Sequence, residues 1–506
     1  MNADVLRVSP ADEHNRVLVE NVHPNLWVNP QPSGRYNLVV LGAGTAGLVA
    51  AAGAAGLGAK VALIEKHFLG GDCLNYGCVP SKAVIRAARV AQTVRTASDY
   101  GVHIPGGFKI NFGEVMERMR RLRAGISQHD SARRFQDLGV DVFLGQGKFL
   151  DDSTVEVEGQ RLQFSRAVIA TGARAAQPSV PGLIEAGFLT NETVFSLTEL
   201  PRRLCVIGAG PIGCEMAQAF RRLGSEVCII TDGQRILPRE DGDAAAIVHE
   251  RLEQEGIRVV LGTRILKVEI VDGTKFLVFE QSGREEHVAS DEILVSIGRT
   301  PNVEGLNLEA AGVTYDRKGV TVDDRLRTTN PRIYAAGDIC SRFKFTHAAD
   351  AMARMVLRNA FFFGRGKASA LVIPWCTFTD PEVAHVGLYE DEARTQGHEV
   401  VTHTVNLADV DRAVLDGATE GFARVHMDAK TGKVLGATLV SEHAGESISE
   451  FVLAMTQGVP LSAFSSTIHP YPTQAEAVKR LGDLSMRARL KPWLRKVFTA
   501  YFKFQR

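Results

Sequence analysis

Two cysteines five positions apart, Cys73 and Cys78, are the residues of this sequence best suited to chemistry. Asn75 and Gly77 lie between them and permit a bend, so the two thiols could close a small disulfide ring. A helix is expected with Pro80 in its first turn, and its N-terminus together with Lys82 favours a thiolate at Cys78. A structural zinc site is disfavoured, because no second Cys or His pair follows at ligand spacing. The remaining alternative is a pair of unrelated buried thiols.

The overall composition excludes several classes of protein. Seven cysteines in 506 residues is an odd and sparse count, which argues against a secreted disulfide framework. Lys and Arg number 58, as do Asp and Glu, so the formal net charge is zero and capture of nucleic acid is not expected. Hydrophobic residues at 45% describe a folded soluble protein of about three or four domains. The N-terminus lacks the apolar segment of a signal peptide, so the mature chain is expected to start where the sequence does.

A strand, a glycine turn, a helix and a second strand are predicted around the motif Gly42-x-Gly44-x-x-Gly47. The glycines let helix N–H groups approach a pyrophosphate, and Glu65, 18 residues after the third glycine, can bond a ribose hydroxyl. The uncharged stretch 36–59 contains six glycines, so it does not predict a membrane span. The alternative, an ordinary glycine-rich helix on a sheet, does not account for the acid at the strand end.

The same unit recurs around Gly208-x-Gly210-x-x-Gly213, between two further apolar strands. Two such units imply two dinucleotides. At the offset where the first unit has an acid, the second has a threonine, so a 2′-phosphate is acceptable and NADPH is favoured slightly over NADH. The threonine is Thr231. The choice of cofactor stays open, because Asp232 favours NADH whereas Arg235 favours NADPH.

The segment from Gly71 to Lys82 resembles the redox-disulfide signature of the class I pyridine nucleotide-disulfide oxidoreductases, the family of glutathione reductase, dihydrolipoamide dehydrogenase and mercuric reductase. The resemblance covers residues 36 to 480. It also rests on three further stretches, which are Ala170-Thr171-Gly172, Gly298-Arg299-Thr300-Pro301-Asn302 and Tyr334-Ala335-Ala336-Gly337-Asp338.

The resemblance implies specific roles. The first glycine unit would bind FAD and the second NADPH or NADH; Cys78 would lie next to the flavin, and Cys73 would exchange with substrate. Lys82 and Glu215 match the family's pair beside flavin N5, although Glu215 could instead be an exposed helix residue. The cofactor-binding residues implied are Gly42, Gly44, Gly47, Glu65, Lys82, Thr171, Gly172, Gly208, Gly210, Gly213, Glu215, Thr231, Gly298, Arg299, Gly337 and Asp338.

The fold implied is α/β, with two Rossmann-like dinucleotide-binding domains and a C-terminal α+β dimerisation domain. Such proteins are homodimers, in which the partner's C-terminal domain completes each active site. The expected boundaries are 1–35 for an extended N-terminal arm, 36–190 and 295–368 for the FAD-binding domain, 191–294 for the NAD(P)-binding domain, 369–485 for the dimerisation domain and 486–506 for a basic tail.

The C-terminal motif departs from the disulfide reductases of this family, which place a His before Pro-Thr and a Glu to form an acid/base dyad. Counting back from Glu476 puts Tyr471 at the His position, and His469 lies two residues too early. Mercuric reductase also has Tyr there, and a Tyr with a pKa near 10 is a poor thiol base. The catalytic residues expected are therefore Cys73, Cys78, Lys82, His469, Tyr471 and Glu476, with the choice between His469 and Tyr471 open.

Two features of a working mercuric reductase are absent from the sequence. There is no C-terminal vicinal Cys pair, since the last cysteine is Cys376, and there is none before Cys73. Transfer of a soft metal ion without such a relay is chemically feasible but handicapped. Hg(II) is therefore not established as the acceptor by the resemblance.

The tail from Met486 to Arg506 contains seven basic residues and no acid. After Pro492 its apolar residues share one helix face. Such a helix suits an anionic membrane surface, or it packs on the dimer. The protein is accordingly expected in the cytoplasm. If the helix binds a membrane, the protein would also contact the inner face of the membrane peripherally; if the helix packs on the dimer, it would not.

The function expected is an FAD-dependent NAD(P)H oxidoreductase, a flavoprotein that passes electrons through a Cys73–Cys78 disulfide to a small-molecule acceptor. The acceptor would be a soft metal ion such as Hg(II), a disulfide or a similar compound. Two alternatives stay open: a flavin-level quinone or electron-acceptor reductase, and a redox-sensing, membrane-docked partner protein.

Overall fold

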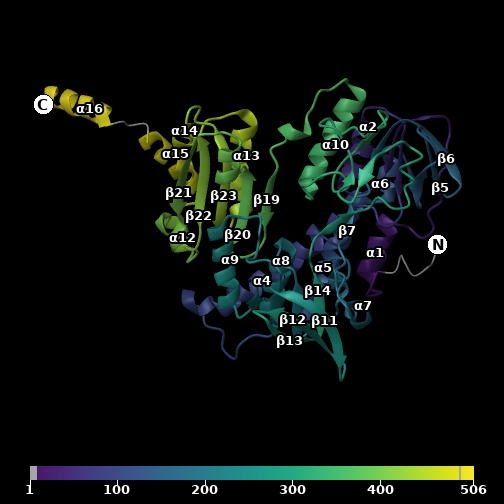
Figure 1. Cartoon of the computed structure of the whole chain (residues 1–506), viewed down its shortest axis with the longest axis horizontal. Coiled ribbons are helices and arrows are strands. Elements are labelled where there is room, and N and C mark those ends of the chain that lie inside the picture. Colours follow the sequence, from purple (N-terminus) through teal and green to yellow (C-terminus); the bar gives the residue numbers. More distant parts are fainter. Residues whose placement is uncertain (1–7, 489–491) are drawn as a thin grey trace. The chain divides into compact units, whose positions relative to one another are not determined.

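The structure is a computed structural model that describes residues 8–488 and 492–506. The chain forms two compact units (Figure 1). The first contains the chain up to Ile236 and the segment Glu255–Leu371, and the second contains Leu237–Gln254 and Val372–Arg506.

The first glycine motif belongs to a sheet with strand order β3-β2-β1-β6-β5-β4, in which β18 also pairs with β6. Strand β1 pairs in parallel with β2 on one side and β6 on the other, so the chain order reverses at β1. Open α/β sheets bind ligands at such a reversal. The predicted strand and helix of the uncharged stretch are confirmed as β1 and α2. The bounds are β1 Tyr36–Leu41, α2 Thr45–Gly56, β2 Val61–Glu65, β3 Val140–Leu144, β4 Gly147–Phe149, β5 Thr154–Val157, β6 Gln160–Ile169 and β18 Ile333–Ala335.

Helices and short strands join this sheet to the rest of the first unit. The cysteine pair lies on α3 Gly71–Asn75 and at the start of α4 Cys78–Arg95. The other elements are α5 Phe112–Ser127, α6 Ala132–Asp137, β7 Ala173–Ala175, α7 Leu183–Ala186, β15 Arg299–Pro301, β16 Tyr315–Asp316, β17 Gly319–Val320 and α10 Thr346–Phe361.

The second glycine motif lies in a smaller parallel sheet with the order β10-β9-β8-β14, again in the first unit. A separate antiparallel sheet, β11-β12-β13, is inserted in the chain between β10 and β14. The bounds are β8 Arg203–Ile207, α8 Pro211–Leu223, β9 Glu226–Ile230, β10 Arg258–Val260, β11 Arg264–Val271, β12 Thr274–Gln281, β13 Arg284–Ser290 and β14 Glu292–Val295.

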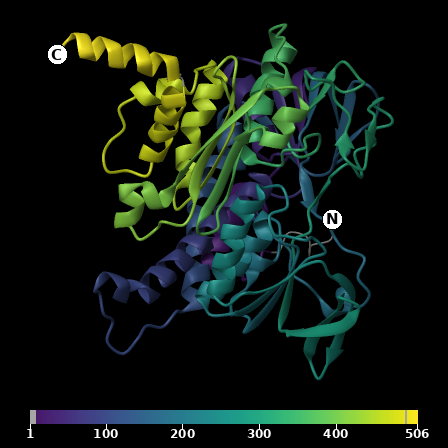
Figure 2. The same cartoon turned by 60° about the vertical axis from the view of Figure 1, so that its left-hand side comes forward.

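The second unit is built on an antiparallel sheet of order β19-β20-β23-β22-β21, whose strands lie side by side in green in Figure 2. The rings of Phe451 and Phe464 stack in its buried core. The bounds are α9 Gly242–Gln254, β19 Pro374–Thr377, β20 Glu382–Gly387, α11 Glu390–Thr395, β21 Val400–Asn406, α12 Asp411–Leu415, β22 Phe422–Asp428, β23 Val434–Ser441, α13 Ala444–Gln457, α14 Ser462–Ser466, α15 Glu476–Ala488 and α16 Pro492–Phe504.

Helix α9 groups with this C-terminal unit although its sequence lies within the predicted nicotinamide domain. The buried carboxylate of Glu240, just before α9, accepts hydrogen bonds of 2.8 Å from Trp375 Nε1 and Tyr389 OH. Arg424 on β22 pairs with Asp243 at the start of α9. These contacts explain why the segment associates with a sheet far along the chain.

The N-terminal segment is not extended throughout, because it contains helix α1 Glu13–Val22. The Asp12 side chain caps this helix by accepting a hydrogen bond of 2.8 Å from the Asn15 amide. Beyond the helix, Trp27 and Asn29 hydrogen-bond to the backbone of edge strand β3. No helix in the described part of the chain is both long and apolar enough to cross a membrane.

Candidate active site

The two candidate redox cysteines lie on either side of a single tight turn. Cys73 is on the short helix α3, and Cys78 is the first residue of α4, with Gly77 between the helices. Both are free thiols; Cys73 is partly buried and Cys78 reaches the surface. The turn fits only glycine at Gly77, where an added Cβ would lie 2.8 Å from a carboxylate oxygen of Asp72.

The thiols are electrostatically different. A hydrogen bond from Cys73 is the largest of the influences that lower the Cys78 pKa to about 6; Thr346 and the charge of Lys82 act in the same direction, against burial. The same hydrogen bond and burial raise the Cys73 pKa. Cys78 is therefore the thiolate near neutral pH, and Cys73 keeps its proton.

Two groups from distant parts of the chain face the start of α4. Lys82 Nζ forms a 2.8 Å ion pair with Glu215 Oε2 of α8, and Glu215 is buried rather than exposed on its helix. The hydroxyl of Thr346, the first residue of α10, lies 3.5 Å from the Cys78 sulfur. The predicted Lys82–Glu215 pair is thus brought together.

Arg299 joins two acids in the same unit. Its guanidinium lies 2.9 Å from Asp72, the neighbour of Cys73, and 3.5 Å from Asp338. Asp72 also accepts a 2.7 Å hydrogen bond from the Asn191 amide. Burial raises the Asp338 pKa, and Arg299 opposes that rise. The conformation of the turn is therefore tied to Gly298-Arg299, a segment far away in sequence.

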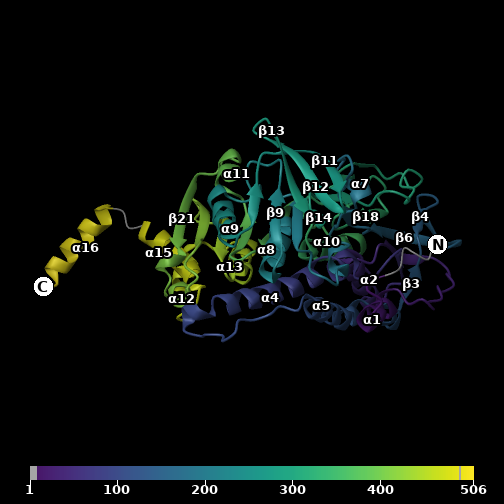
Figure 3. The same ribbon diagram turned by 90° about the horizontal axis from the view of Figure 1, so that it is seen from below.

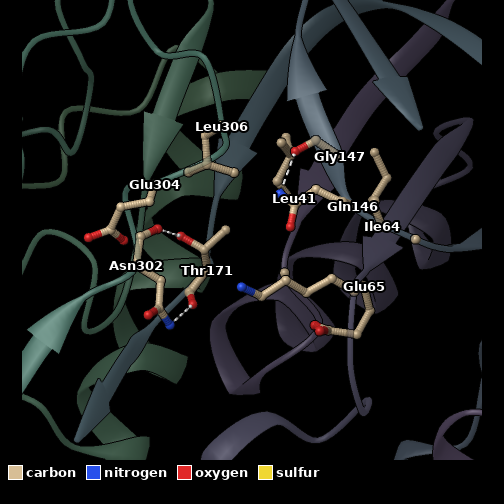
Figure 4. Close-up of a pocket in the computed structure, with 12 residues that line it drawn as sticks. Leu41, Ile64, Glu65, Gln146, Gly147, Thr171, Asn302, Glu304 and Leu306 are labelled. Atoms are coloured by element: carbon tan, nitrogen blue, oxygen red, sulfur yellow. Dashed lines mark hydrogen bonds between the residues drawn. The ribbon is translucent and has the colours of Figure 1, made fainter. Parts of the chain in front are cut away.

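A pocket lies beside the first glycine motif, at the ends of β1 and β2 (Figure 4). Glu65 lines it, and its carboxylate accepts hydrogen bonds from the amides of Ala43 (2.6 Å) and His67 (2.8 Å). Burial raises the Glu65 pKa, while those amides lower it. The remaining lining residues are Leu41, Gly42, Ile64, Lys66, Gly145, Gln146, Gly147, Thr171, Asn302, Glu304 and Leu306.

Thr171 and Asn302 close one wall of this pocket. The Thr171 hydroxyl donates to the Asn302 carbonyl, and the Asn302 amide donates to the Thr171 carbonyl, each at 2.9 Å (Figure 4). The Asn302 backbone amide donates to the Gly172 carbonyl at 3.0 Å. Two of the motifs predicted to share a site are therefore in contact.

The second glycine motif has the same local geometry. Gly208 has φ +103°, and a Cβ on Gly213 would lie 2.2 Å from the Gly208 oxygen. Gly210 caps α8, and a Cβ there would meet no described atom within 4 Å, so this side of the turn is open. Thr231 directly follows β9, and its hydroxyl accepts a 3.2 Å hydrogen bond from the Gly233 amide.

The C-terminal candidates belong to the second unit. Neither His469 nor Tyr471 has Glu476, the acid of the family's dyad, as its hydrogen-bond partner among the described contacts. His469 Nε2 lies 2.9 Å from Glu450 Oε2 on α13, whereas the Tyr471 hydroxyl donates to Asp411 at 2.7 Å. The hydrogen bond to Asp411 raises the Tyr471 pKa. Glu476 accepts from Arg480 at 2.8 Å, so no described hydrogen bond joins Glu476 to His469 or Tyr471.

Comparison with known proteins identifies the family. Residues 36–353 match the family described as pyridine nucleotide-disulphide oxidoreductase, and residues 373–481 match its dimerisation domain. The chain belongs to the pyridine nucleotide-disulphide oxidoreductases. A mercuric reductase from Bacillus cereus is 35% identical over 453 residues, 89% of this chain and 72% of that protein. A dihydrolipoyl dehydrogenase from Bacillus subtilis is 32% identical over 464 residues, 88% of this chain and 96% of that protein.

Solved structures agree with the family assignment. The HOCl-induced flavoprotein disulfide reductase RclA from Escherichia coli superimposes with a TM-score of 0.79 at 28% identity, covering 89% of this chain and 100% of that one. A Cu(II) complex of the same protein gives a TM-score of 0.79 at 27% identity, with the same coverage. The predicted α/β fold with a C-terminal dimerisation domain is confirmed, and that domain indicates a homodimer.

Members of this oxidoreductase family use FAD and NAD(P)H, and the first glycine motif fits such a group. A Cβ on Gly71 would lie 2.6 Å from the Cα of Gly44, so the redox turn and the glycine turn meet where only glycine is tolerated. Glu65 lines the adjoining pocket. Gly44 is the N-cap of α2, so no side chain there would block a pyrophosphate at the N-terminus of the helix.

Several residues of the site were not found from the sequence. Thr346, Asp72 and Gln146 carry no local signal, since each is an ordinary polar residue at the edge of an element. Glu450 lies 19 residues before His469, a separation at which only the helix packing brings the side chains together. Asn302 was part of a recognised motif, yet its two hydrogen bonds to Thr171 could not be read from that motif. The described residues contain no cluster of His, Cys, Asp and Glu suited to a metal ion.

Proposed function

We propose that this protein is an NAD(P)H-dependent reductase that works through the thiol pair Cys73 and Cys78. The observation that carries the proposal is the difference in acidity between the two thiols. Cys78 has a low pKa and accepts a hydrogen bond from the protonated Cys73. Bound FAD would take a hydride from NAD(P)H and supply the electron pair that opens the Cys73–Cys78 disulfide. Lys82, held by Glu215, would keep a positive charge near the thiolate.

Cofactor binding is assigned to the residues that the sequence singled out. Gly42, Gly44 and Gly47 would hold the FAD pyrophosphate, Glu65 its ribose, and Asp338 its flavin side. The Thr171-Gly172 and Gly298-Arg299 turns would complete that site, with Gly337 before Asp338. The second motif would hold the nicotinamide cofactor, and Thr231 in place of an acid supports NADPH over NADH. The domain boundaries proposed are 36–190 with 295–368, 191–294, and 369–485.

A soft metal ion is the acceptor class that the C-terminal segment supports best. Tyr471 has a raised pKa, so it stays protonated at neutral pH and cannot act as a thiol base. The Cys78 thiolate can bind a soft ion without such a base, and Cys73 releases its proton when it joins as the second ligand. For Hg(II) the reaction balances as Hg(II) + NAD(P)H → Hg(0) + NAD(P)⁺ + H⁺. The similarity to mercuric reductases agrees with this acceptor.

Disulfide reduction is a second candidate, favoured by the His469–Glu450 pair. A carboxylate 2.9 Å from His469 Nε2 fixes the orientation of the ring. From the partner subunit, such a pair could protonate a leaving thiolate and take the proton back. The reaction would be RSSR + NAD(P)H + H⁺ → 2 RSH + NAD(P)⁺.

The test is an acceptor panel containing Hg(II), Cu(II), oxidised glutathione, lipoamide and a quinone, run with NADPH and with NADH. We expect Hg(II) to give the highest kcat/KM and NADPH to be preferred. Quinone reduction that persists in Cys78→Ser would instead indicate a flavin-level reductase, and the lack of turnover with every acceptor would favour a redox sensor.

We also propose a peripheral membrane contact for α16. Its apolar residues are exposed, from 48% for Phe498 to 90% for Phe504, and the sequence around them is basic without an acid. Headgroup attraction is worth about 1 kcal/mol per Lys or Arg near an anionic surface, and salt screens it. The full chain should sediment with anionic vesicles at low salt, and a chain ending at residue 485 should not. Equal sedimentation of both forms would eliminate the membrane contact.

A further inference from the structure

Helix α1 lies outside the residues that match the family, yet it packs beneath the redox turn. The family match begins at residue 36, whereas α1 comprises Glu13–Val22. In Figure 3, α1 lies beside α5, and both belong to the same unit as the cysteine pair. Helix α1 is therefore an element outside the family match that packs close to the turn between the two cysteines.

One buried arginine connects the two. Arg123 of α5 is 2% exposed, and its guanidinium donates to the Asn75 carbonyl and to the Asn15 side-chain oxygen, both at 2.7 Å. Asn75 is the last residue of α3, between the two cysteines. Asn15 is on α1 and is itself 3% exposed. The result is a continuous buried contact from α1 to the turn between the thiols.

The turn depends on Asn75 in other ways as well. The Asn75 amide donates to the carbonyls of Leu69 (3.0 Å) and Gly71 (2.8 Å), so the residue closes the entry to α3. Near the other end of α1, the Leu69 amide donates to the Val22 carbonyl at 3.1 Å. Helix α1 thus contacts the turn directly at its entry and, through Arg123, between the cysteines.

A buried guanidinium is costly unless every contact it makes is well placed. Burial lowers the Arg123 pKa to about 10, which records that cost. Removing Asn15 would leave the guanidinium with fewer partners and free it to turn away from the Asn75 carbonyl. A looser turn would then weaken the hydrogen bond from Cys73 that stabilises the Cys78 thiolate.

We propose that α1 is a positioning element for the redox pair, in which Asn15 holds Arg123 against the turn and so maintains the thiol geometry. Asn15 and Arg123 are positioning residues, because neither touches the sulfur atoms. The inference deepens the proposed function, since it assigns a role to the residues that hold the same thiol pair.

The experiment measures alkylation of Cys78 by iodoacetamide against pH in reduced holoenzyme, with the modified peptide quantified by mass spectrometry. Asn15→Ala should move the profile upward by about half a pH unit, so that the rate near pH 6 falls about twofold. The groups that bear directly on the Cys78 sulfur are unchanged in this variant; they are Cys73, Asp72, Lys82, Arg299 and Thr346.

Two matched variants separate positioning from general stability. Asn21→Ala removes a 2.9 Å hydrogen bond to Ser127, which joins the same two helices without involving Arg123 or Asn75, and should lower the melting temperature without moving the profile. Asn15→Asp keeps an acceptor for Arg123 and should restore the native profile. If Asn15→Ala does not fold, Arg123→Lys, which loses the two-point donation, should show the same upward shift.

The outcomes also distinguish this inference from the proposed function. A native profile in Asn15→Ala, or an equal shift in Asn21→Ala, would overturn the positioning role and leave the reductase proposal intact. Equilibration of the native enzyme with glutathione, by 2 GSH + protein disulfide ⇌ GSSG + protein dithiol, reports on the proposed function itself. If the native enzyme forms no Cys73–Cys78 disulfide, the reductase proposal fails, whatever α1 does.

Discussion

The turn that carries Cys73 and Cys78 and the loop that carries His469 and Tyr471 differ in burial and in hydrogen bonding. Behind the cysteines, Asn75 is 1% exposed and makes hydrogen bonds through both its side chain and its carbonyl. In the loop, Tyr471 is 71% exposed and has a single hydrogen bond to Asp411. The turn leaves little freedom for substitution, and Tyr471 leaves more. His469 is the constrained residue of the loop, because its side chain is 6% exposed and lies 2.9 Å from Glu450.

This difference separates two parts of the chemistry. The proposed electron transfer would require the turn to keep two sulfurs and a cofactor close together, and the geometry of the turn is set by glycine contacts and buried polar groups. The C-terminal loop has only to suit an acceptor, and acceptors differ across the mercuric reductases and dihydrolipoyl dehydrogenases that resemble the chain. We infer that specificity is adjusted in the loop while the turn stays constant.

The largest effect should come from the cysteines themselves. Cys73→Ser or Cys78→Ser should lower kcat for the preferred acceptor by more than about 10³-fold, because no other thiol can replace either sulfur. Stopped-flow and steady-state oxidation of NAD(P)H measure the loss. If either variant keeps native turnover with that acceptor, the cysteine turn does not carry the reaction. The proposed difference in role between the turn and the loop would then be wrong.

The next effect concerns the loop and depends on the acceptor. His469→Ala should lower any turnover of oxidised glutathione by about 10²-fold, the range of general acid–base catalysis, and leave Hg(II) reduction within about twofold. Tyr471→Phe should leave both nearly unchanged, because that hydroxyl is committed to Asp411. Loss of disulfide turnover in Tyr471→Phe but not in His469→Ala would place the acid/base group at Tyr471 instead.

A smaller effect is expected in the acidity of Cys78. With a pKa of about 6, its thiolate fraction rises as the pH increases through that value and is nearly complete above pH 7. Cys73→Ala removes the largest stabilising influence, so the pKa should rise and the alkylation rate at pH 6.5 should fall several-fold. Thr346→Val removes a weaker contact and should give a smaller shift in the same direction. A profile that is unchanged in both variants would show that the thiolate is stabilised by other groups.

Much of the reactive centre could be predicted from the sequence because its signals are local. The glycine motifs, the acid at the end of β2 and the cysteine spacing all lie within single strand–turn–helix units, where the backbone fixes the distances. The strands and helices predicted around Gly42 and Gly208 are present for this reason.

The remaining parts depend on side chains that meet across long stretches of sequence. Arg123 lies 48 residues after the Asn75 carbonyl that it contacts, and Glu240 lies 135 residues before Trp375. Nothing in the local pattern marks Asn15, and the prolines at positions 24, 30 and 32 predict an extended N-terminal segment. Such contacts follow from tertiary packing and not from periodicity, and they are found only once the helices are placed.

The smallest effect compares the stability contributed by the two regions. Asn75→Ala removes two buried side-chain hydrogen bonds and leaves the Leu69 and Gly71 carbonyls unpaired by that amide, so the melting temperature of the holoenzyme should fall by a few degrees. Tyr471→Phe removes one exposed hydrogen bond and should leave the melting temperature within about 1 °C. Differential scanning calorimetry of both variants at one protein concentration measures the contrast, since dimer dissociation makes the transition concentration-dependent. If the melting temperature falls more in Tyr471→Phe than in Asn75→Ala, the loop is the more constrained region. The Tyr471 hydroxyl would then stabilise the dimer interface, which a single chain does not contain.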